Sequence, residues 1–482
     1  MDYKNIYIIG IGGCASSAIG EFLNNQGLIV SGSDMSEKKE LHDLIKKGIT
    51  VHFGHKKENL YTNGKPDIVL YTPAIIALNP NNPELLEAKA QGIKTESWEE
   101  FIGDFLKKQG NIGITVSGSE GKGTTAGILT AILAGTQFDP LSILGAKIKN
   151  IKDSNDSNIY IGEGKTYILE GDEYNRNFLH YHPDINVMIN FDYEHPETYK
   201  NFDEYSQAFA DFFNEMSGKK KLILRATEKI VNFVNTYTFS NITWFGYPEE
   251  IRKSTISGEI YIIENHRVTE KGNTFTLRKT DSSFQADFMI PALPGYIALN
   301  GTGAIIAALE VGMTADVINK NLQNFKGMVR RFDLYKTNEN GVFITDYGHS
   351  PGAVGYILKE IRELFPDKKV HLIFQPHLFS RTYNFFNEFV DELAKADTIS
   401  ILDIYPAREN IAHWSTKVNS QMLTDQVLLR NPNVTFAGQA KDIVKNMENV
   451  IDANEVTCFI GAGDMDQYYE GLLHKFGCKP WF

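Results

Sequence analysis

The sequence predicts an α/β protein with parallel sheets in more than one domain. Short apolar runs of strand length alternate with stretches of helical composition along the chain, which is the pattern of βαβ units. Three stretches, starting near residues 5, 111 and 327, each open with an apolar strand that runs into glycines or polar residues. A chain of 482 residues is also too long for one ordinary core, and its length suggests roughly three domains.

The composition predicts a globular protein of the cytoplasm without membrane insertion. Hydrophobic residues make up 42% of the chain, enough for large cores, but no apolar run approaches the ~18 residues that span a bilayer. The N-terminal segment "MDYKNIYIIGIGG" leads into glycines without a cleavage site, so it does not predict a signal peptide. Cys14, Cys458 and Cys478 make no disulfide framework and suit a reducing compartment. The net charge of −12 argues against nucleic acid as a partner.

The first stretch predicts a Rossmann-type unit. Residues 6–9 form a buried-strand run, a glycine turn follows, residues 14–25 have helical composition, and a second strand ends at Asp34. The turn contains Gly10, Gly12 and Gly13, but Ser16 or its neighbours replace the third glycine of the usual fingerprint. This turn either holds ligand phosphates over the helix N-terminus or is a structural βα turn.

The second stretch carries "SGSEGKGTT" at residues 117–125, between a strand at 112–116 and a helix at 123–134. Glycines, a lysine and threonines at a strand-to-helix junction are typical of a phosphate-binding loop. Two residues are unusual: Gly123 follows Lys122 where a magnesium-binding hydroxyl is expected, and Glu120 would repel a phosphate. We favour a phosphate loop over a chance run of glycines.

Two further strands of this stretch place metal-binding side chains near the loop. Residues 166–169 predict a strand that delivers Glu170 to its end, and "INVMINFDYEHP" predicts another that delivers His195. A carboxylate and an imidazole beside a phosphate loop can hold Mg²⁺. The neighbouring acids Asp172 and Glu173 also fit a solvated loop.

Strands of the third stretch end in polar residues at successive positions. These residues are Asp346, His349, His377, Arg381 and Arg408. Ligands of open α/β sheets bind beyond the carboxyl ends of the strands, so this series predicts a binding site.

Taken in order, these motifs resemble the Mur ligases, the ATP-dependent amino-acid ligases of cell-wall precursor synthesis. The resemblance covers nearly the whole chain and rests on "GIGGCASSAIGEFLNNQGLIVSGSD", "SGSEGKGTT", "EGDEYNRNFLHYHPDINVMIN", "MVRRFD", "TDYGHSPGAV", "FQPHLFSRT" and "DIYPARE". It implies a three-domain architecture. A Rossmann-like domain at 1–108 would bind the UDP-sugar, a central P-loop domain at 109–326 would bind ATP, and a Rossmann-like domain at 327–482 would close on ATP and the amino acid.

The resemblance also implies roles for individual residues, with ATP and Mg²⁺ as cofactors. Catalysis is implied for Lys122, Glu170, His195, Arg331 and Asp346, and metal binding for Thr124, Glu170 and His195. ATP binding is implied for Gly118, Ser119, Gly121, Lys122, Gly123, Thr124, Thr125, Tyr296, Asn300, Arg331 and Asp346. Substrate binding is implied for Gly10, Gly12, Gly13, Asp34, Thr72, His349, His377 and Arg381.

The chain looks most like the branch that joins L-alanine to UDP-N-acetylmuramate through an acyl phosphate, in a monomer or dimer. The short "EGDEYNRNF" favours it over the recycling branch, which adds a tripeptide, and residues 202–212 contain no lysine for carbamylation. A ligase for an altered acceptor and a non-catalytic nucleotide-binding protein remain alternatives. The chain departs from the family at Ser119, Glu120 and Gly123, at Tyr296 and Ile297 near the adenine, and at Ser350.

Overall fold

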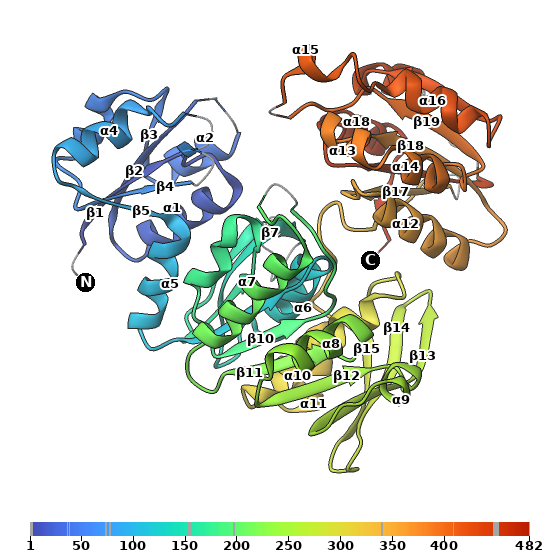
Figure 1. Cartoon of the computed structure of the whole chain (residues 1–482), viewed down its shortest axis with the longest axis horizontal. Helices are drawn as coiled ribbons and strands as arrows, with labels where there is room; N and C mark the ends of the chain where they lie inside the picture. The colour runs from blue at the N-terminus through green and yellow to red at the C-terminus, as the bar shows by residue number, and fades with distance from the viewer. Residues whose placement is uncertain are drawn as a thin grey trace. The chain divides into compact units, whose positions relative to one another are not determined.

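The fold contains three α/β sheets, which confirms the predicted three-domain α/β architecture (Figure 1). The computed structural model describes residues 3–35, 37, 39–72, 75–76, 79–149, 151, 157–195, 198–338, 341–407, 409–446 and 453–481. The chain divides into two compact units, one comprising residues 1–291 and 296–326 and the other residues 292–295 and 327–482. No helix of the described residues is long and apolar enough to cross a membrane.

The first sheet has the strand order β3-β2-β1-β4-β5, and all its strands pair in parallel. Its elements are β1 (Asn5–Ile9), α1 (Cys14–Asn25), β2 (Ile29–Asp34), α2 (Lys39–Lys46), β3 (Thr50–Phe53), η1 (Lys57–Tyr61), β4 (Ile68–Tyr71), α4 (Pro83–Ala90), β5 (Lys94–Ser97) and α5 (Trp98–Lys108). The predicted helix at 14–25 and the strand ending at Asp34 are confirmed. The strand order reverses beside β1, so the glycine turn after β1 lies at the topological switch point, where such sheets bind ligands.

The central sheet has ten strands in the order β15-β14-β13-β12-β11-β10-β6-β9-β7-β8. Its elements are β6 (Ile112–Ser117), α6 (Lys122–Leu133), β7 (Leu141–Ile148), β8 (Ser157–Ile161), β9 (Thr166–Glu170), η3 (Tyr174–His180), β10 (Ile185–Met188), α7 (Phe202–Glu215), β11 (Lys221–Arg225), α8 (Glu228–Tyr237), β12 (Ile242–Gly246), α9 (Pro248–Lys253), β13 (Glu259–Thr269), β14 (Gly272–Lys279), β15 (Gln285–Ile290), α10 (Ile297–Glu310) and α11 (Ala315–Leu322). Strand β6 pairs in parallel with β10 on one side and β9 on the other. The loop that follows β6 therefore lies between the ends of two strands that come later in the chain.

Helices α6 and α10 anchor that loop in the interior. Their sequences, "KGTTAGILTAIL" and "IALNGTGAIIAALE", are small and aliphatic with a charge only at one end, and nearly all their residues are buried. Helices that are apolar all round pack inside a domain. Glycines in α10 allow close packing on the sheet, since a Cβ on Gly303 would lie 2.7 Å from Cγ1 of Val187. The packing of α6 and α10 fixes the N-terminus of α6, where Lys122 begins the helix.

The third sheet has the order β20-β19-β18-β21-β17-β16-β22, with β16 and β22 antiparallel to their neighbours. Its elements are β16 (Asp333–Lys336), β17 (Val342–Asp346), α12 (Pro351–Leu364), β18 (Lys369–Gln375), α13 (Phe379–Asn384), α14 (Phe386–Leu393), β19 (Thr398–Leu402), α15 (Ile411–Trp414), α16 (Ser420–Leu428), β20 (Val434–Gly438), α17 (Ala440–Asn446), β21 (Glu455–Gly461), α18 (Asp466–Lys475) and β22 (Lys479–Pro480). Strands β17, β18, β19 and β21 lie in the third stretch, and Asp346 ends β17 as predicted.

A buried polar network supports the first sheet. The carboxylate of Glu84, at the start of α4, accepts hydrogen bonds from Tyr7 Oη (2.8 Å), Ser33 Oγ (2.6 Å) and Asn59 Nδ2 (2.8 Å), and it pairs with His55 Nδ1 at 3.0 Å. Glu84 and Ser33 are both fully buried. Because Ser33 directly precedes Asp34, the network also fixes the strand end that carries this predicted substrate residue.

Replacing Glu84 by alanine should destabilise the protein by about 3–5 kcal/mol, because several buried donors would lose their acceptor at once. Denaturant unfolding measures this loss. Lys89→Ala, at an exposed position of the same helix, is the matched control and should change the free energy of unfolding by less than about 0.5 kcal/mol. A Glu84→Ala variant as stable as this control would show that the network is dispensable.

Candidate functional site

Glycines shape the loop between β6 and α6. Gly118 and Gly121 have φ of 113° and 81°, a region that favours glycine. Space is also restricted, because a Cβ on Gly118 would lie 2.5 Å from the carbonyl oxygen of Asn190 and one on Gly121 would lie 3.0 Å from Oδ1 of Asn300. Both glycines are therefore required for the loop conformation, which excludes a chance run of glycines.

The loop is tied to the segment that follows β10. Oγ of Ser119 donates a hydrogen bond to Oδ1 of Asn190 (3.0 Å), and the backbone N–H of Glu120 donates to the same oxygen (2.9 Å). The backbone N–H of Asp192 donates in turn to Oγ of Ser119 (3.1 Å). Ser119 thus has a defined structural role, whereas the Glu120 side chain is exposed.

Lys122 turns back over its own loop. Its Nζ donates to the carbonyl oxygens of Gly118 (2.7 Å) and Ser119 (3.2 Å), and it contacts both carboxylate oxygens of Glu173 at 2.8 and 3.0 Å. Burial alone would lower the pKa of Lys122, but the Glu173 carboxylate outweighs burial and raises it. The lysine is therefore a charged group at the centre of the loop.

Glu173 is a site residue, and its interpretation as part of a solvated loop is wrong. Its side chain is fully buried, between Lys122 and Nε2 of His195, which lies 3.8 Å from Oε1 of Glu173. Two left-handed residues, Asn175 (φ 52°) and Arg176 (φ 59°), turn the chain immediately afterwards. The hydroxyl of Tyr199 donates to the Glu173 carbonyl (2.5 Å) and holds this turn in place. Two acids three residues apart after a buried strand were the available signal in the sequence.

A candidate cation site lies beside Lys122. Ligating atoms of Glu173, Glu194 and His195 all lie within 4.8 Å of one another. Burial raises the pKa of Glu194 to about 7, with Lys122 opposing and Glu173 reinforcing the shift. The strand predicted to deliver His195 is shorter than expected: β10 ends at Met188, and a loop with His195 in the left-handed region (φ 56°) carries the histidine to the site. Glu194 was missed because only its histidine neighbour suggested metal binding.

Glu170 ends β9 as predicted and lies against the first turn of α6. Its Oε1 accepts a hydrogen bond from the backbone N–H of Gly145 (2.5 Å). A Cβ on Gly123 would lie 3.0 Å from that same oxygen, and one on Gly145 would lie 3.1 Å from Oε2. Gly123 therefore replaces the usual hydroxyl residue where the Glu170 carboxylate leaves little room. Metal binding by Glu170 remains a prediction, since the described cation cluster contains Glu173 and Glu194 with His195.

The two threonines after Gly123 differ in their surroundings. Thr125 is completely buried, and its Oγ1 has no hydrogen-bond partner within the described part of the chain. Thr124 retains slight exposure (6%). On α10, Asn300 lies with its amide against Gly121, and Tyr296 and Ile297 stand at the start of the helix. Contacts of Tyr296 and Asn300 with adenine remain predictions.

In the third sheet, Asp346 organises the loop that carries Arg331. Its carboxylate accepts from the backbone N–H groups of Phe332 (2.7 Å) and Gly348 (2.6 Å), and burial raises its pKa. The Arg331 guanidinium lies 5.2 Å from the ring centre of Tyr347, and Arg330 lies 5.1 Å from it. Arg330, which the sequence did not single out, donates to the Gly461 carbonyl (2.5 Å) and joins this loop to β21.

His349, His377 and Arg381 meet as predicted at the ends of β17 and β18. The two imidazole centres are 6.0 Å apart, and Nη1 of Arg381 donates to Nδ1 of His377 (3.0 Å). Burial, reinforced by Arg381, lowers the pKa of His349 to about 3 and that of His377 to about 4. Both imidazoles are neutral at pH 7, so Arg381 supplies the positive charge here. Arg408 lies outside the described residues.

The predicted substrate residues of the first sheet also come together. The backbone N–H of Gly12 donates to Oδ2 of Asp34 (3.0 Å), and a Cβ on Gly10 would lie 3.0 Å from Oγ1 of Thr72. Ser16 donates to the Gly10 carbonyl (2.6 Å), so the residue that replaces the third glycine closes the turn. Gly13 lies in the same turn, where its backbone N–H donates to the Gly10 carbonyl (3.1 Å).

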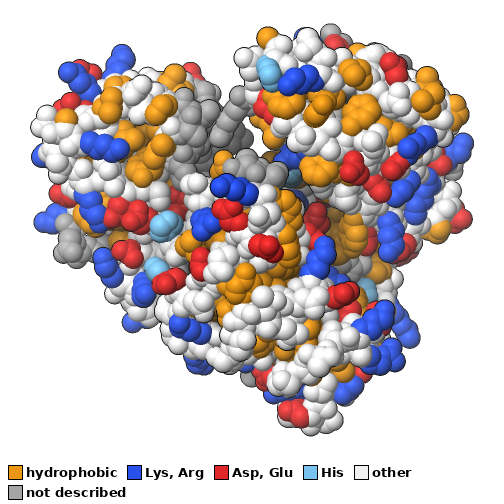
Figure 2. Space-filling model, viewed as in Figure 1, with side chains coloured by type: hydrophobic (Ala, Val, Ile, Leu, Met, Phe, Trp, Pro, Cys, Tyr) orange, Lys and Arg blue, Asp and Glu red, His pale blue; other side chains and the backbone are white. Residues whose placement is uncertain are grey.

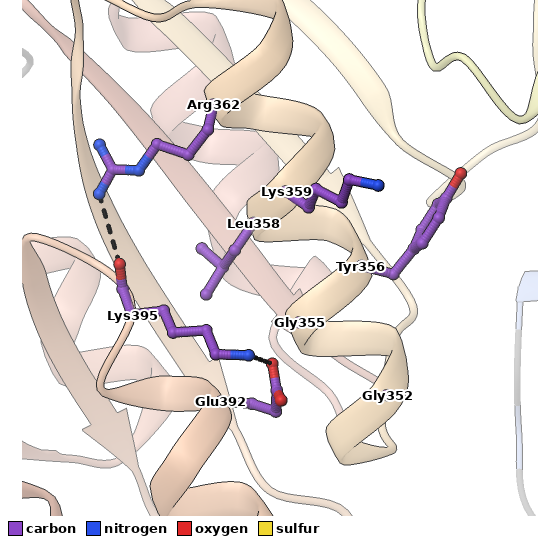
Figure 3. Close-up of a pocket in the computed structure, with 8 residues that line it drawn as sticks. All are labelled: Gly352, Gly355, Tyr356, Leu358, Lys359, Arg362, Glu392 and Lys395. Carbon is purple, nitrogen blue, oxygen red and sulfur yellow. Dashed lines mark hydrogen bonds and ion pairs between the residues drawn. The ribbon is translucent and has the colours of Figure 1, made fainter.

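A groove of about 500 Å³ lies between α12 and α14 and contains none of the predicted site residues (Figure 3). Its lining residues are Gly352, Gly355, Tyr356, Leu358, Lys359, Arg362, Glu392 and Lys395. Lys395 pairs with Glu392 (2.6 Å) and Arg362 with Asp397 (2.7 Å), so these cations are neutralised by the protein itself.

Comparisons with known proteins cover nearly the whole chain. Residues 5–109 match the Mur ligase family catalytic domain, 116–308 the Mur ligase middle domain, and 330–463 the Mur ligase glutamate ligase domain. A UDP-N-acetylmuramate–L-alanine ligase of Aquifex aeolicus is 31% identical over 474 residues, covering 98% of each chain. The chain belongs to the Mur ligase family.

Solved structures of Mur ligases show the same fold. A UDP-N-acetylmuramate-alanine ligase from Thermotoga maritima has a TM-score of 0.78 at 22% identity and covers 98% of this chain and 99% of its own. A murein peptide ligase from Psychrobacter arcticus has a TM-score of 0.69 at 20% identity, with 98% of each chain covered. This Mur ligase is accordingly an ATP-dependent amide ligase whose middle domain binds ATP.

Glu173→Gln should lower the turnover of this Mur ligase by at least ~10²-fold, the size of one lost electrostatic contact in a transition state. The amide cannot neutralise Lys122 or bind a cation as a carboxylate does. Steady-state release of ADP measures the effect. Glu163→Gln, an exposed acid before β9, is the control and should leave turnover unchanged. Equal rates for the two variants would remove Glu173 from the active site.

Proposed function

We propose that this Mur ligase joins L-alanine to the carboxylate of UDP-N-acetylmuramate in peptidoglycan precursor synthesis, in the cytoplasm. The contact of Lys122 with Glu173, next to Glu194 and His195, carries the proposal. A buried lysine and a group of side chains that could hold a metal ion lie close together beyond the end of β6, which supports phosphoryl transfer to a carboxylate. The choice of substrates is supported by relatives of Aquifex aeolicus and Clostridium kluyveri named L-alanine ligases, each 31% identical over 98% of the chain.

The cluster fits Mg²⁺. Two carboxylates and one imidazole provide few protein ligands, which leaves positions for water and phosphate oxygens, the usual environment of this ion. Glu173, Glu194 and His195 would hold the ion, and Glu170 and Thr124 are further predicted ligands at the start of α6. Bound there, Mg²⁺ supplies positive charge against the transferring phosphoryl group.

The residues of the chain divide the reaction between them. Lys122 and the backbone N–H groups of the loop bind the β- and γ-phosphates and orient the γ-phosphorus for attack by the acceptor carboxylate, with ADP as leaving group. The amino acid's nitrogen then attacks the acyl carbon, phosphate leaves, and the nitrogen loses a proton. Arg381, with the neutral His349 and His377, offers the positive charge and hydrogen bonds that suit the acyl end of the substrate. Arg331 and Asp346 are proposed nucleotide contacts.

Purified protein with ATP, Mg²⁺, UDP-N-acetylmuramate and each of the twenty amino acids tests the proposal. L-Alanine should give ADP, phosphate and a product heavier by one alanyl residue, detected by mass spectrometry. A parallel reaction with the L-Ala-γ-D-Glu-containing tripeptide serves as the alternative. Joining of the tripeptide alone would establish the recycling activity, and binding of ATP without any joined amine would favour a nucleotide-binding protein.

Thr124→Ala should raise the Mg²⁺ concentration for half-maximal rate and reduce turnover more than Thr125→Ala does. Gly123 has no hydroxyl, and Oγ1 of Thr125 is enclosed in the core, so Thr124 is the better donor. Mg²⁺ titrations of the ADP release rate compare the two variants. Equal and mild effects of both threonine changes would show that the metal ligand lies elsewhere.

Lys122→Ala should nearly abolish turnover, while binding of the UDP-sugar to the first domain, measured by calorimetry, survives.

A further inference from the structure

Glu99 is a buried carboxylic acid that the reaction does not use. It lies in the first turn of α5, and its side chain is only 2% exposed. Its own backbone amide and the Ser97 side chain hydrogen-bond the carboxyl group, but Oε2 has no hydrogen-bond partner among the described residues. A buried carboxylate without a counter-charge is costly, so this position favours the protonated form.

The surroundings of Glu99 are acidic and phenolic. Asp172, from the loop between β9 and η3, acts on it electrostatically. A charge on Glu99 would in turn reinforce the burial that raises the pKa of Tyr181, after η3, and of Tyr71, at the end of β4. Glu96 of β5 and Glu100 of α5 also act on Tyr71. Glu99 forms no ion pair within the described part of the chain. Burial, reinforced by Asp172, raises the pKa of Glu99 to about 8.

Helix α5 packs directly on the segment that carries Glu173. A Cβ on Gly103 of α5 would lie 1.9 Å from the carbonyl oxygen of His180 in η3, so the two backbones leave no space between them. The chain from Glu170 through Asp172 and Glu173 leads into η3. A negative charge on Glu99 would oppose Asp172 across this contact and disturb the loop that directs Glu173 toward Lys122.

We propose that Glu99 is a positioning residue of the active site: as an uncharged acid it allows α5 to pack on η3 and so holds Glu173 against Lys122. In its consequence for the reaction, this inference rests on the proposed function. In its consequences for stability and for nucleotide binding, it does not depend on which acceptor or amino acid the enzyme uses.

The first test compares the pH dependence of unfolding for the wild type, Glu99→Gln and Glu100→Gln. Glutamine mimics the neutral acid, and Glu100, exposed in the same turn, is the matched control. Between the ordinary pKa of 4.5 and about 8, the folded state keeps a proton that the unfolded state releases. From about pH 5 to 8, the unfolding equilibrium constant of the wild type should therefore rise tenfold per pH unit relative to that of Glu99→Gln, which means a loss of stability. Above pH 8 the difference between the two proteins should level off. Glu100→Gln should follow the wild type. A difference independent of pH would overturn the neutral-acid assignment.

The second test measures the dissociation constant of magnesium–ATP by calorimetry from pH 6 to 9.5. At pH 7, Glu99→Gln should bind within about twofold of the wild type, because both carry a neutral group there. Above pH 8 the wild type and Glu100→Gln should weaken by several-fold relative to Glu99→Gln, and turnover should follow. Parallel binding profiles for all three proteins would overturn the positioning role even if the stability test succeeds. A failure to join L-alanine would reject only the proposed substrate, since neither test uses it.

Discussion

The proposed active centre depends on one contact, the ion pair between Lys122 and Glu173. Burying a carboxylate as completely as Glu173 is unfavourable unless a cation and hydrogen bonds compensate it, and removal of either partner leaves an uncompensated charge. The pair joins residues 51 positions apart, one at the start of α6 and one after β9. In the fold, the parallel pairing of β6 with β9 brings these two positions together. Lys122 donates hydrogen bonds to two loop carbonyls and to Glu173, so phosphate oxygens bound at the proposed site would compete with these groups for the lysine's hydrogens.

The position of β6 in the central sheet explains why so many site residues converge. Its neighbours β9 and β10 both come later in the chain, and each brings polar residues to the same edge. From the β10 side, Asn190 holds the backbone of the loop, and Glu194 and His195 follow it. From the β9 side come Glu170 and Glu173. The hydrogen bonds from Asn190 on one side and the acids on the other restrict the motion of the loop. Such preorganisation is what electrostatic catalysis needs. On the face shown in Figure 2, acidic and basic side chains are interspersed.

Strand ends were predictable, but the side chains that loops turn inward were not. The apolar runs and glycines predicted the strands that end at Asp34, Glu170 and Asp346. Such strands can be predicted because a buried strand is a short run of consecutive apolar residues. Glu173 and Glu194 were missed because the orientation of their side chains depends on left-handed backbone conformations at residues 175, 176 and 195. Asparagine adopts this conformation more readily than most residues, but an arginine or a histidine in a sequence does not predict it. Glu99 gave no signal either, because an acid in the first turn of a helix is ordinarily a surface residue that favours the helix dipole.

The departure of the phosphate loop from the family pattern at Gly123 has a steric explanation. Glu170 lies so close to Gly123 and Gly145 that neither position has room for an unhindered side chain. A hydroxyl residue after Lys122 would therefore displace the carboxylate that ends β9. Moving the hydroxyl one position along a helix rotates it by about 100°, so Thr124 presents its oxygen in a different direction from a residue at 123. A cation held by Thr124, as proposed, would then lie in a different place relative to Lys122, and so would the acids that complete its coordination. Glu173 and Glu194, gathered with His195 beside Lys122, are the acids that the rest of the fold supplies.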